Sequence, residues 1–87
     1  MLERKFVVNN DTGIHARPAT KLTSLAAKFQ SDVQLEFNGK SINVKSIMAV
    51  MTLSVPGQAE VLVRVNGTDE AEAMEQIEVL FQDGFGE

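Results

Sequence analysis

The sequence contains no cysteine and only one histidine, His15, among its 87 residues. Without cysteine the chain can form neither disulfides nor thiolate centres. A zinc or iron site usually takes about three or four imidazole, thiolate or carboxylate ligands, so a lone histidine argues against a dedicated metal site. We therefore expect that the protein holds no metal and needs no cofactor.

Long apolar segments are also missing. No apolar run approaches the roughly 18 residues that a membrane-spanning helix needs, and residues 1–8 lack the apolar stretch of a signal peptide. Hydrophobic residues make up 44% and charged residues 23% of the chain, which is ordinary for a globular domain. We expect one domain over residues 1–87, a cytoplasmic monomer that is not inserted in a membrane.

Basic residues are absent from the last part of the chain. Residues 1–66 hold all eight Lys and Arg against five acids, whereas residues 67–87 hold seven acids and no Lys or Arg. Binding to nucleic acid needs a net basic surface, and basic residues scattered over several segments do not form one. The acidic end is interpreted as the solvated face of a helix, and the expected partners are proteins or phosphorylated groups.

Hydrophobic periodicity and turn signals predict seven secondary-structure elements. Strands are expected at 5–8, 33–37, 42–44 and 61–66, and helices beginning at 15 or 16, at 47, and just after 68 or 69. Asn38-Gly39 is a strong hairpin signal between the second and third strands. The order strand, helix, strand, strand, helix, strand, helix (βαββαβα) indicates an α+β domain with three helices on one face of a four-stranded, mainly antiparallel sheet.

The segment around His15 combines three features suited to anion chemistry. Pro18 is tolerated only in the first helical turn, so the helix must begin just before it and His15 lies at or beside the N-cap. The amide groups of a helix start bind anions, and the positive helix end favours the neutral imidazole, a nucleophile. Arg17 can direct a planar set of donors at phosphate oxygens, and Gly13 lets the turn project the histidine outward.

Structural explanations compete with this interpretation. Arg17 can be an ordinary exposed helix residue, and Thr12 can simply bond its own turn. A metal site is less well supported than phosphoryl transfer, because nothing nearby supplies further ligands. A Ser-His-Asp hydrolase is less well supported again, because so small a domain leaves little room for a substrate pocket.

The whole chain resembles HPr, the histidine-containing phosphocarrier family of the bacterial sugar phosphotransferase system, in its Gram-positive form with a regulatory serine. The resemblance rests on the segments 13–19 (GIHARPA), 38–40 (NGK), 45–48 (KSIM) and 83–87 (DGFGE). It implies an open-faced β-sandwich and a phosphoryl carrier that is not itself an enzyme.

The resemblance also implies roles for residues and partners. His15 would accept a phosphoryl group on Nδ1 from phospho-Enzyme I and pass it to IIA domains of sugar permeases. Arg17 would neutralise charge, and the backbone amides of Ala16 and Arg17 would hold the phosphoryl oxygens. Ser46 would be phosphorylated by HPr kinase/phosphorylase, slowing transfer and allowing binding to catabolite control protein A.

A short apolar helix after Ser46 predicts a docking surface. Such a helix cannot bury all of its apolar residues, so we expect Ile47 and Met48 to be exposed and to form, with Met51, Ala16 and Leu22, an apolar patch around His15. Ser46 itself is predicted to be the N-cap of this helix.

Two positions depart from the family pattern, and two other functions stay open. Ser54 stands where the family usually has glycine, which affects the turn, and Ala49 often is glycine in the Gram-positive branch. A nitrogen-related phosphocarrier would share His15, but the Ser46 segment favours the sugar branch. A catabolite-repression homologue, a regulatory binding protein, typically lacks the active histidine that this chain has.

Overall fold

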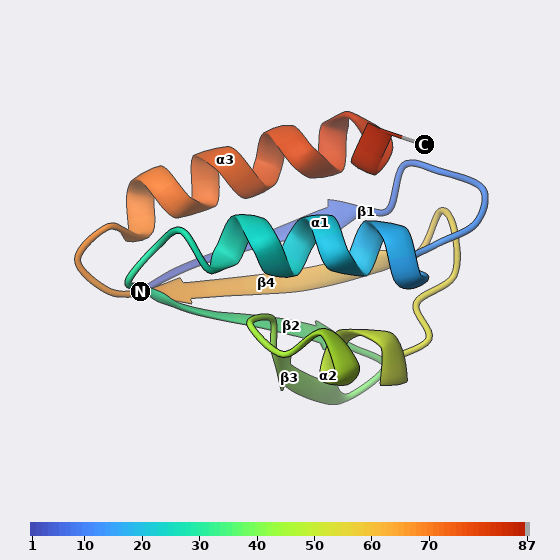
Figure 1. Cartoon of the computed structure of the whole chain (residues 1–87), viewed down its shortest axis with the longest axis horizontal. Helices are drawn as coiled ribbons and strands as arrows, with labels where there is room; N and C mark the ends of the chain where they lie inside the picture. The colour runs from blue at the N-terminus through green and yellow to red at the C-terminus, as the bar shows by residue number, and fades with distance from the viewer. Residues whose placement is uncertain (87) are drawn as a thin grey trace.

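The computed structural model describes residues 1–86 and confirms the predicted order of elements (Figure 1). A final 3₁₀ turn, η1, follows the last helix and was not expected from the sequence. The elements are β1 (Leu2–Val7), α1 (Ala16–Ala26), β2 (Asp32–Phe37), β3 (Lys40–Asn43), α2 (Ile47–Thr52), β4 (Glu60–Asn66), α3 (Glu70–Gln82) and η1 (Gly84–Gly86).

The four strands form one antiparallel sheet in the order β1-β4-β2-β3. β4 is the central partner: Val65 pairs with Leu2 of β1 on one side and with Val33 of β2 on the other. Its buried valines alternate with exposed or half-buried residues, which places one face against the core. Asn38 and Gly39, with φ of 55° and 82°, form the predicted tight connection between β2 and β3.

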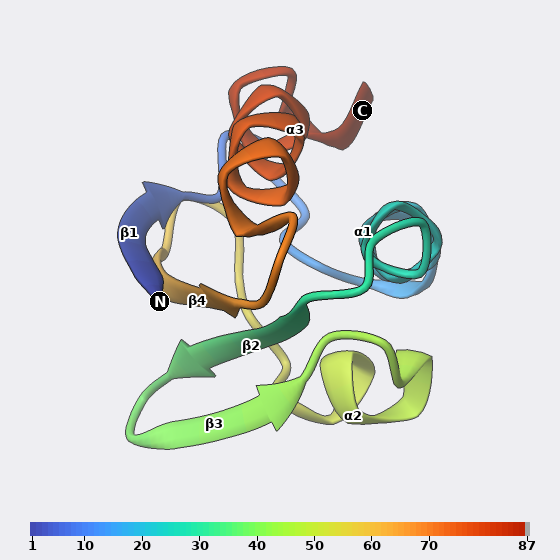
Figure 2. The ribbon, with the colours of Figure 1, turned by 90° about the vertical axis from the view of Figure 1, so that its left-hand side faces the viewer.

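All three helices lie on one side of the curved sheet, which Figure 2 shows nearly end-on. The predicted α+β architecture, an open-faced sandwich, is therefore confirmed. Side chains from the inner sheet face and the three helices form one buried cluster, whose largest members include Phe81, Phe85, Leu22, Leu35 and Met74.

Several element boundaries differ from the expected ones, most of all at the start of β1. β1 begins at Leu2 instead of Lys5, because its pairing with β4 continues to Val65. α1 ends at Ala26, and Phe29 follows in a tight turn in which its N–H donates to Ala26 O at 3.1 Å. Val44 lies just beyond β3 but is fully buried.

Candidate functional site

The loop from Asn9 to Ile14 connects β1 to α1 and packs against the segment before β4. Gly13 has a φ of +79°, a conformation that favours glycine. A Cβ atom on Gly13 would lie 2.1 Å from the carbonyl oxygen of Val55, so the close approach of the two backbones also requires glycine. The N–H of Ile14 donates to the same Val55 oxygen at 2.9 Å. Gly13 therefore sets the distance between the two loops.

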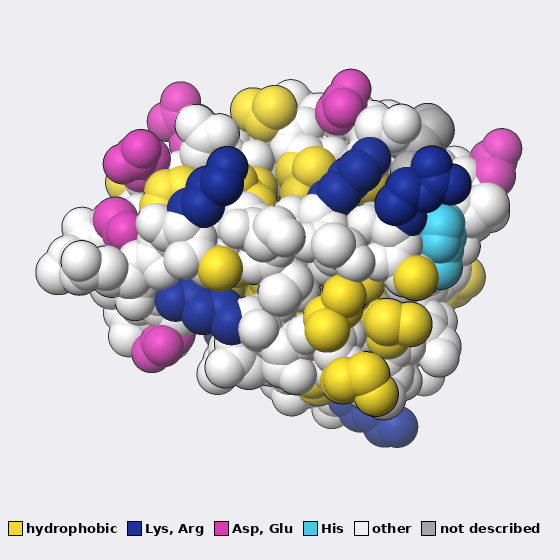
Figure 3. Space-filling model, viewed as in Figure 1, with side chains coloured by type: hydrophobic (Ala, Val, Ile, Leu, Met, Phe, Trp, Pro, Cys, Tyr) yellow, Lys and Arg dark blue, Asp and Glu magenta, His cyan; other side chains and the backbone are white. Residues whose placement is uncertain are grey.

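His15 is the N-cap of α1, as predicted. Its backbone is extended (φ −91°, ψ −161°), its carbonyl accepts the N–H of Ala19 at 2.9 Å, and its side chain makes no capping hydrogen bond. The imidazole is exposed at one end of the molecule (cyan in Figure 3), beside apolar side chains that lie over α2. The ring is therefore accessible to a partner protein.

The imidazole Nε2 lies 3.1 Å from the hydroxyl oxygen of Thr12. In a neutral imidazole one ring nitrogen carries the proton and the other carries the lone pair. When Nε2 carries the proton it donates to Thr12, and the nucleophilic lone pair then lies on Nδ1. The sequence interpretation that Thr12 only bonds its own turn is thus incomplete; the signal was a hydroxyl three residues before the histidine, across a glycine turn.

The first turn of α1 supplies backbone N–H groups next to the imidazole. Pro18 has no N–H and Ala19 donates to His15, so Ala16 and Arg17 provide the amides that precede the first intrahelical bond. The first turn contains no acidic residue that would compete with an anion. Arg17 is exposed two residues from His15. This arrangement suits an anionic group carried on the imidazole.

The side chains of the expected apolar patch differ in exposure. Met48 is 69% exposed and Met51 is 40% exposed. Met51 borders, with His15 and Ala16, a shallow cavity of about 370 Å³. Ile47 is partly buried and packs against the core. Leu22 is only 1% exposed, so its assignment to a docking surface is wrong: it lies one turn after Pro18 and Ala19, on the face of α1 that the core covers.

Ser46 and the family departures have clear structural positions. Ser46 is exposed and caps α2, its hydroxyl oxygen accepting the N–H of Ala49 at 3.3 Å, which confirms the predicted N-cap. Ser54 takes a φ of 54°, the region in which glycine is favoured. Ala49 lies inside α2, and its N–H donates to the Ser46 hydroxyl oxygen.

Two further findings concern residues 1–86. No group of three or more His, Cys, Asp or Glu side chains within that range is arranged to hold a metal ion. None of the helices in the described part of the chain is both long and apolar enough to cross a membrane.

Comparison with known proteins places this geometry in a family. Residues 2–83 match the family model for the phosphorylation site of the phosphotransferase-system HPr component. An HPr structure from Thermoanaerobacter tengcongensis is 39% identical over 100% of this chain and 98% of its own, with a TM-score of 0.95. The histidine-containing phosphocarrier protein of a Mycoplasma is 30% identical, with 95% and 96% covered and a TM-score of 0.89.

A protein of catabolite repression is similar as well. Crh of Bacillus subtilis is 42% identical, with 95% of each chain covered and a TM-score of 0.76. The family model, the fold and the exposed histidine at the start of α1 all indicate the same family. The chain therefore belongs to the HPr family, the phosphocarrier proteins of the phosphotransferase system.

Proposed function

We propose that this chain, acting as one cytoplasmic domain over residues 1–87, carries phosphoryl groups on Nδ1 of His15 from phospho-Enzyme I to IIA domains of sugar permeases. The observation that carries the proposal is the exposed His15 imidazole at the N-terminus of α1, with Nε2 hydrogen-bonded to Thr12. When Nε2 carries the proton and donates it to Thr12, the nucleophilic lone pair lies on Nδ1.

In the transfer step one N–P bond forms as another breaks. The Nδ1 lone pair attacks the phosphorus of the donor phosphohistidine, a new N–P bond forms, and the N–P bond of the donor breaks as its imidazole takes back an electron pair. Nε2 keeps its proton and remains bonded to Thr12. The step needs positioning and charge stabilisation rather than a deep pocket, in line with the shallow cavity beside His15.

Arg17 and the first-turn amides stabilise the phosphoryl oxygens in this proposal. The amides of Ala16 and Arg17 lie at the positive end of the α1 dipole, where an anion is favoured. The Arg17 guanidinium adds a charge-assisted, bidentate contact. Met48 and Met51 form the apolar contact for Enzyme I and IIA domains, because both are exposed on α2 and Met51 borders the same cavity as His15.

A regulatory role at Ser46 belongs to the same proposal. Ser46 is exposed, so a kinase can reach its hydroxyl. A phosphate there would add about two negative charges next to Met48 and oppose docking of a phosphorylated donor, by repulsion and desolvation. HPr kinase/phosphorylase would add the group, and catabolite control protein A would bind the modified form.

The similarity to Crh supports a second candidate, a regulatory binding protein of catabolite repression. Such a protein would use the Ser46 surface and would carry no phosphoryl group on a histidine. The exposed His15 with its Thr12 contact favours the carrier. The two functions differ in whether Enzyme I labels the chain.

Incubation with Enzyme I and labelled phosphoenolpyruvate tests the proposal. We expect acid-labile labelling of the wild type and none of His15→Ala, with the fold unchanged because the imidazole is exposed. Arg17→Ala should slow transfer about 10- to 100-fold, the range expected from loss of one hydrogen bond to a charged group. Arg4→Ala is the matched control, since Arg4 pairs with Glu78 on α3. Undiminished labelling of His15→Ala would refute the carrier function.

A further inference from the structure

Asn10 is one of only two polar residues buried within residues 1–86, the other being Ser31. Its side-chain oxygen accepts the N–H of Gly13 at 2.6 Å and the N–H of Thr12 at 3.1 Å. Its side-chain nitrogen donates to the carbonyl of Gly13 at 3.4 Å. The side-chain amide of Asn10 thus binds the backbone of Thr12 and Gly13, the two residues before Ile14 and His15.

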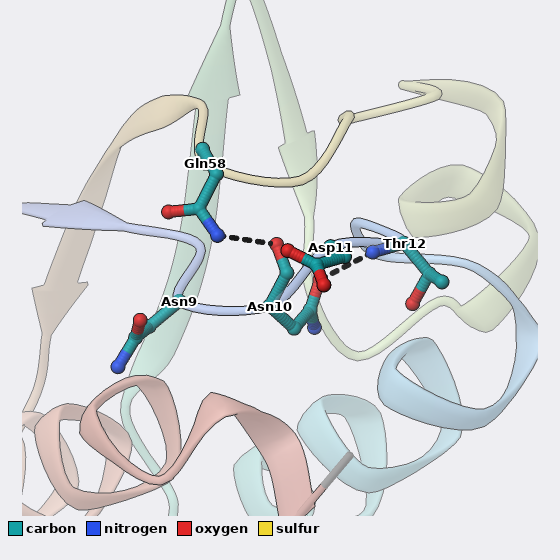
Figure 4. A pocket seen from close by; sticks show the side chains of 5 residues that line it. All are labelled: Asn9, Asn10, Asp11, Thr12 and Gln58. Carbon is teal, nitrogen blue, oxygen red and sulfur yellow. Dashed lines mark hydrogen bonds between the residues drawn. The ribbon is translucent and has the colours of Figure 1, made fainter.

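The rest of the molecule holds Asn10 in place. Its side-chain nitrogen also donates to the carbonyl of Gly84 at 3.4 Å, and its own carbonyl accepts the side-chain N–H of Gln58 at 2.9 Å. Figure 4 shows Gln58 pointing at the Asn10 backbone across a polar cavity, with Thr12 joined to Asn10 from the other side. A Cβ on Gly84 would lie 2.4 Å from the Asn9 carbonyl oxygen, so the C-terminal turn packs directly on this loop.

The contacts form a continuous path to the nucleophile. Asn10 fixes the backbone of Thr12 and Gly13, Gly13 is seated against Val55, and the Thr12 hydroxyl contacts Nε2 of His15 at 3.1 Å. If the Asn10 acceptor is lost, the Thr12 and Gly13 amides must turn toward water, and the Thr12 hydroxyl moves with them.

We propose that Asn10 is a positioning residue for phosphorylation of His15: it holds Thr12 where its hydroxyl contacts Nε2, and this contact fixes the orientation of the imidazole from which Nδ1 accepts the phosphoryl group. This inference rests on the proposed function of His15. Asn10 touches neither the imidazole nor the transferred group, and it acts only through Thr12.

Two variants and one control test the inference. Asn10→Ala removes the acceptor, and Thr12→Val removes the hydroxyl while leaving the backbone contacts intact. Asn9→Ala is the control, because Asn9 lies in the same loop but its exposed side chain bonds only the Gln82 carbonyl, at 3.3 Å. For each protein we would measure the imidazole ¹⁵N chemical shifts of His15, which report the hydrogen bond at Nε2, and the rate of transfer from phospho-Enzyme I.

In the wild type and in Asn9→Ala, the ¹⁵N shift of Nε2 should be that of a hydrogen-bonded ring nitrogen. In Asn10→Ala and Thr12→Val, this shift should move toward that of a solvated imidazole, and kcat should fall about five- to tenfold, the range expected from one net hydrogen bond. The double variant should lose no more than either single variant, because both act through one contact.

A wild-type Nε2 shift in Asn10→Ala, or a rate loss no greater than in Asn9→Ala, would overturn the inference. An unchanged Nε2 shift in Thr12→Val would overturn it as well, even if Asn10→Ala failed to fold. Failure of the wild type to accept a phosphoryl group would instead refute the proposed function, and the comparison of Nε2 shifts would still decide the role of Asn10.

Discussion

Replacement of Gly13 by alanine tests whether the loop before His15 depends on a close backbone approach. Alanine at a φ of +79° costs about 1–2 kcal/mol. The new Cβ would also lie 2.1 Å from the Val55 oxygen. To relieve that overlap the two loops must separate, which breaks the hydrogen bond from Ile14 to Val55. Loss of this bond destabilises the fold by about a further 1 kcal/mol. We therefore expect a loss of about 2–3 kcal/mol.

Thermal unfolding provides the assay. An 87-residue domain unfolds with an entropy near 0.18 kcal/mol/K, so the Tm of Gly13→Ala should fall by about 11–17 °C. Gly39→Ala is the matched control: φ is +82° there, but nothing lies within 4 Å of the added Cβ. The Tm of Gly39→Ala should fall only by the part due to backbone strain, about 5–11 °C. Equal losses in the two variants would show that the approach to Val55 is not tight.

Three further predictions concern other parts of the molecule. The Asp69 carboxylate accepts hydrogen bonds from the Ser31 side chain, which has the largest effect, and from the N–H of Gln30. These bonds hold the pKa of Asp69 below its ordinary value of 3.8. The Tm gap between the wild type and Asp69→Asn should be constant well above pH 3.8 and close as the pH falls through the lower folded pKa. Ser46→Asp should slow transfer from Enzyme I at unchanged Tm; equal rates for genuine phospho-Ser46 and unmodified protein would refute this gating. Met48→Ser should raise the KM for Enzyme I about fivefold without loss of stability, whereas Val79→Ser, a 57% exposed apolar position on α3, should leave the KM unchanged.

Local signals were sufficient to predict most of the fold. The alternation of Val61, Val63 and Val65 and the Asn38-Gly39 turn depend on neighbours in sequence, and both features are confirmed. Boundaries depend on partners far along the chain, which is why the pairing of Leu2 with Val65 extended β1 beyond the expected start. The 3₁₀ turn packs on residues far away in sequence: Gly84 lies against the carbonyl oxygen of Asn9, and the Lys21 ammonium donates to the carbonyl of Phe85.

The same distinction between local signals and distant contacts applies to the candidate site. Pro18 located the start of α1 and therefore the position of His15, because its effect on the helix is local. The burial of Leu22 was missed, because an apolar helix residue looks the same whether it faces the core or a partner. Asn10 looked like an ordinary turn residue: its role depends on Gln58 and Gly84, which only the folded chain brings to it.

The central position of β4 has a consequence for how the protein folds. β2 and β3 can pair as soon as their hairpin forms, but β1 borders only β4 in the sheet. The first strand to be synthesised therefore has no neighbour until residues 60–66 are in place. Such distant pairings slow folding, and an unpaired strand edge can meanwhile pair with another chain. The loop that carries His15 directly follows this strand, so competence for phosphorylation should appear late in folding.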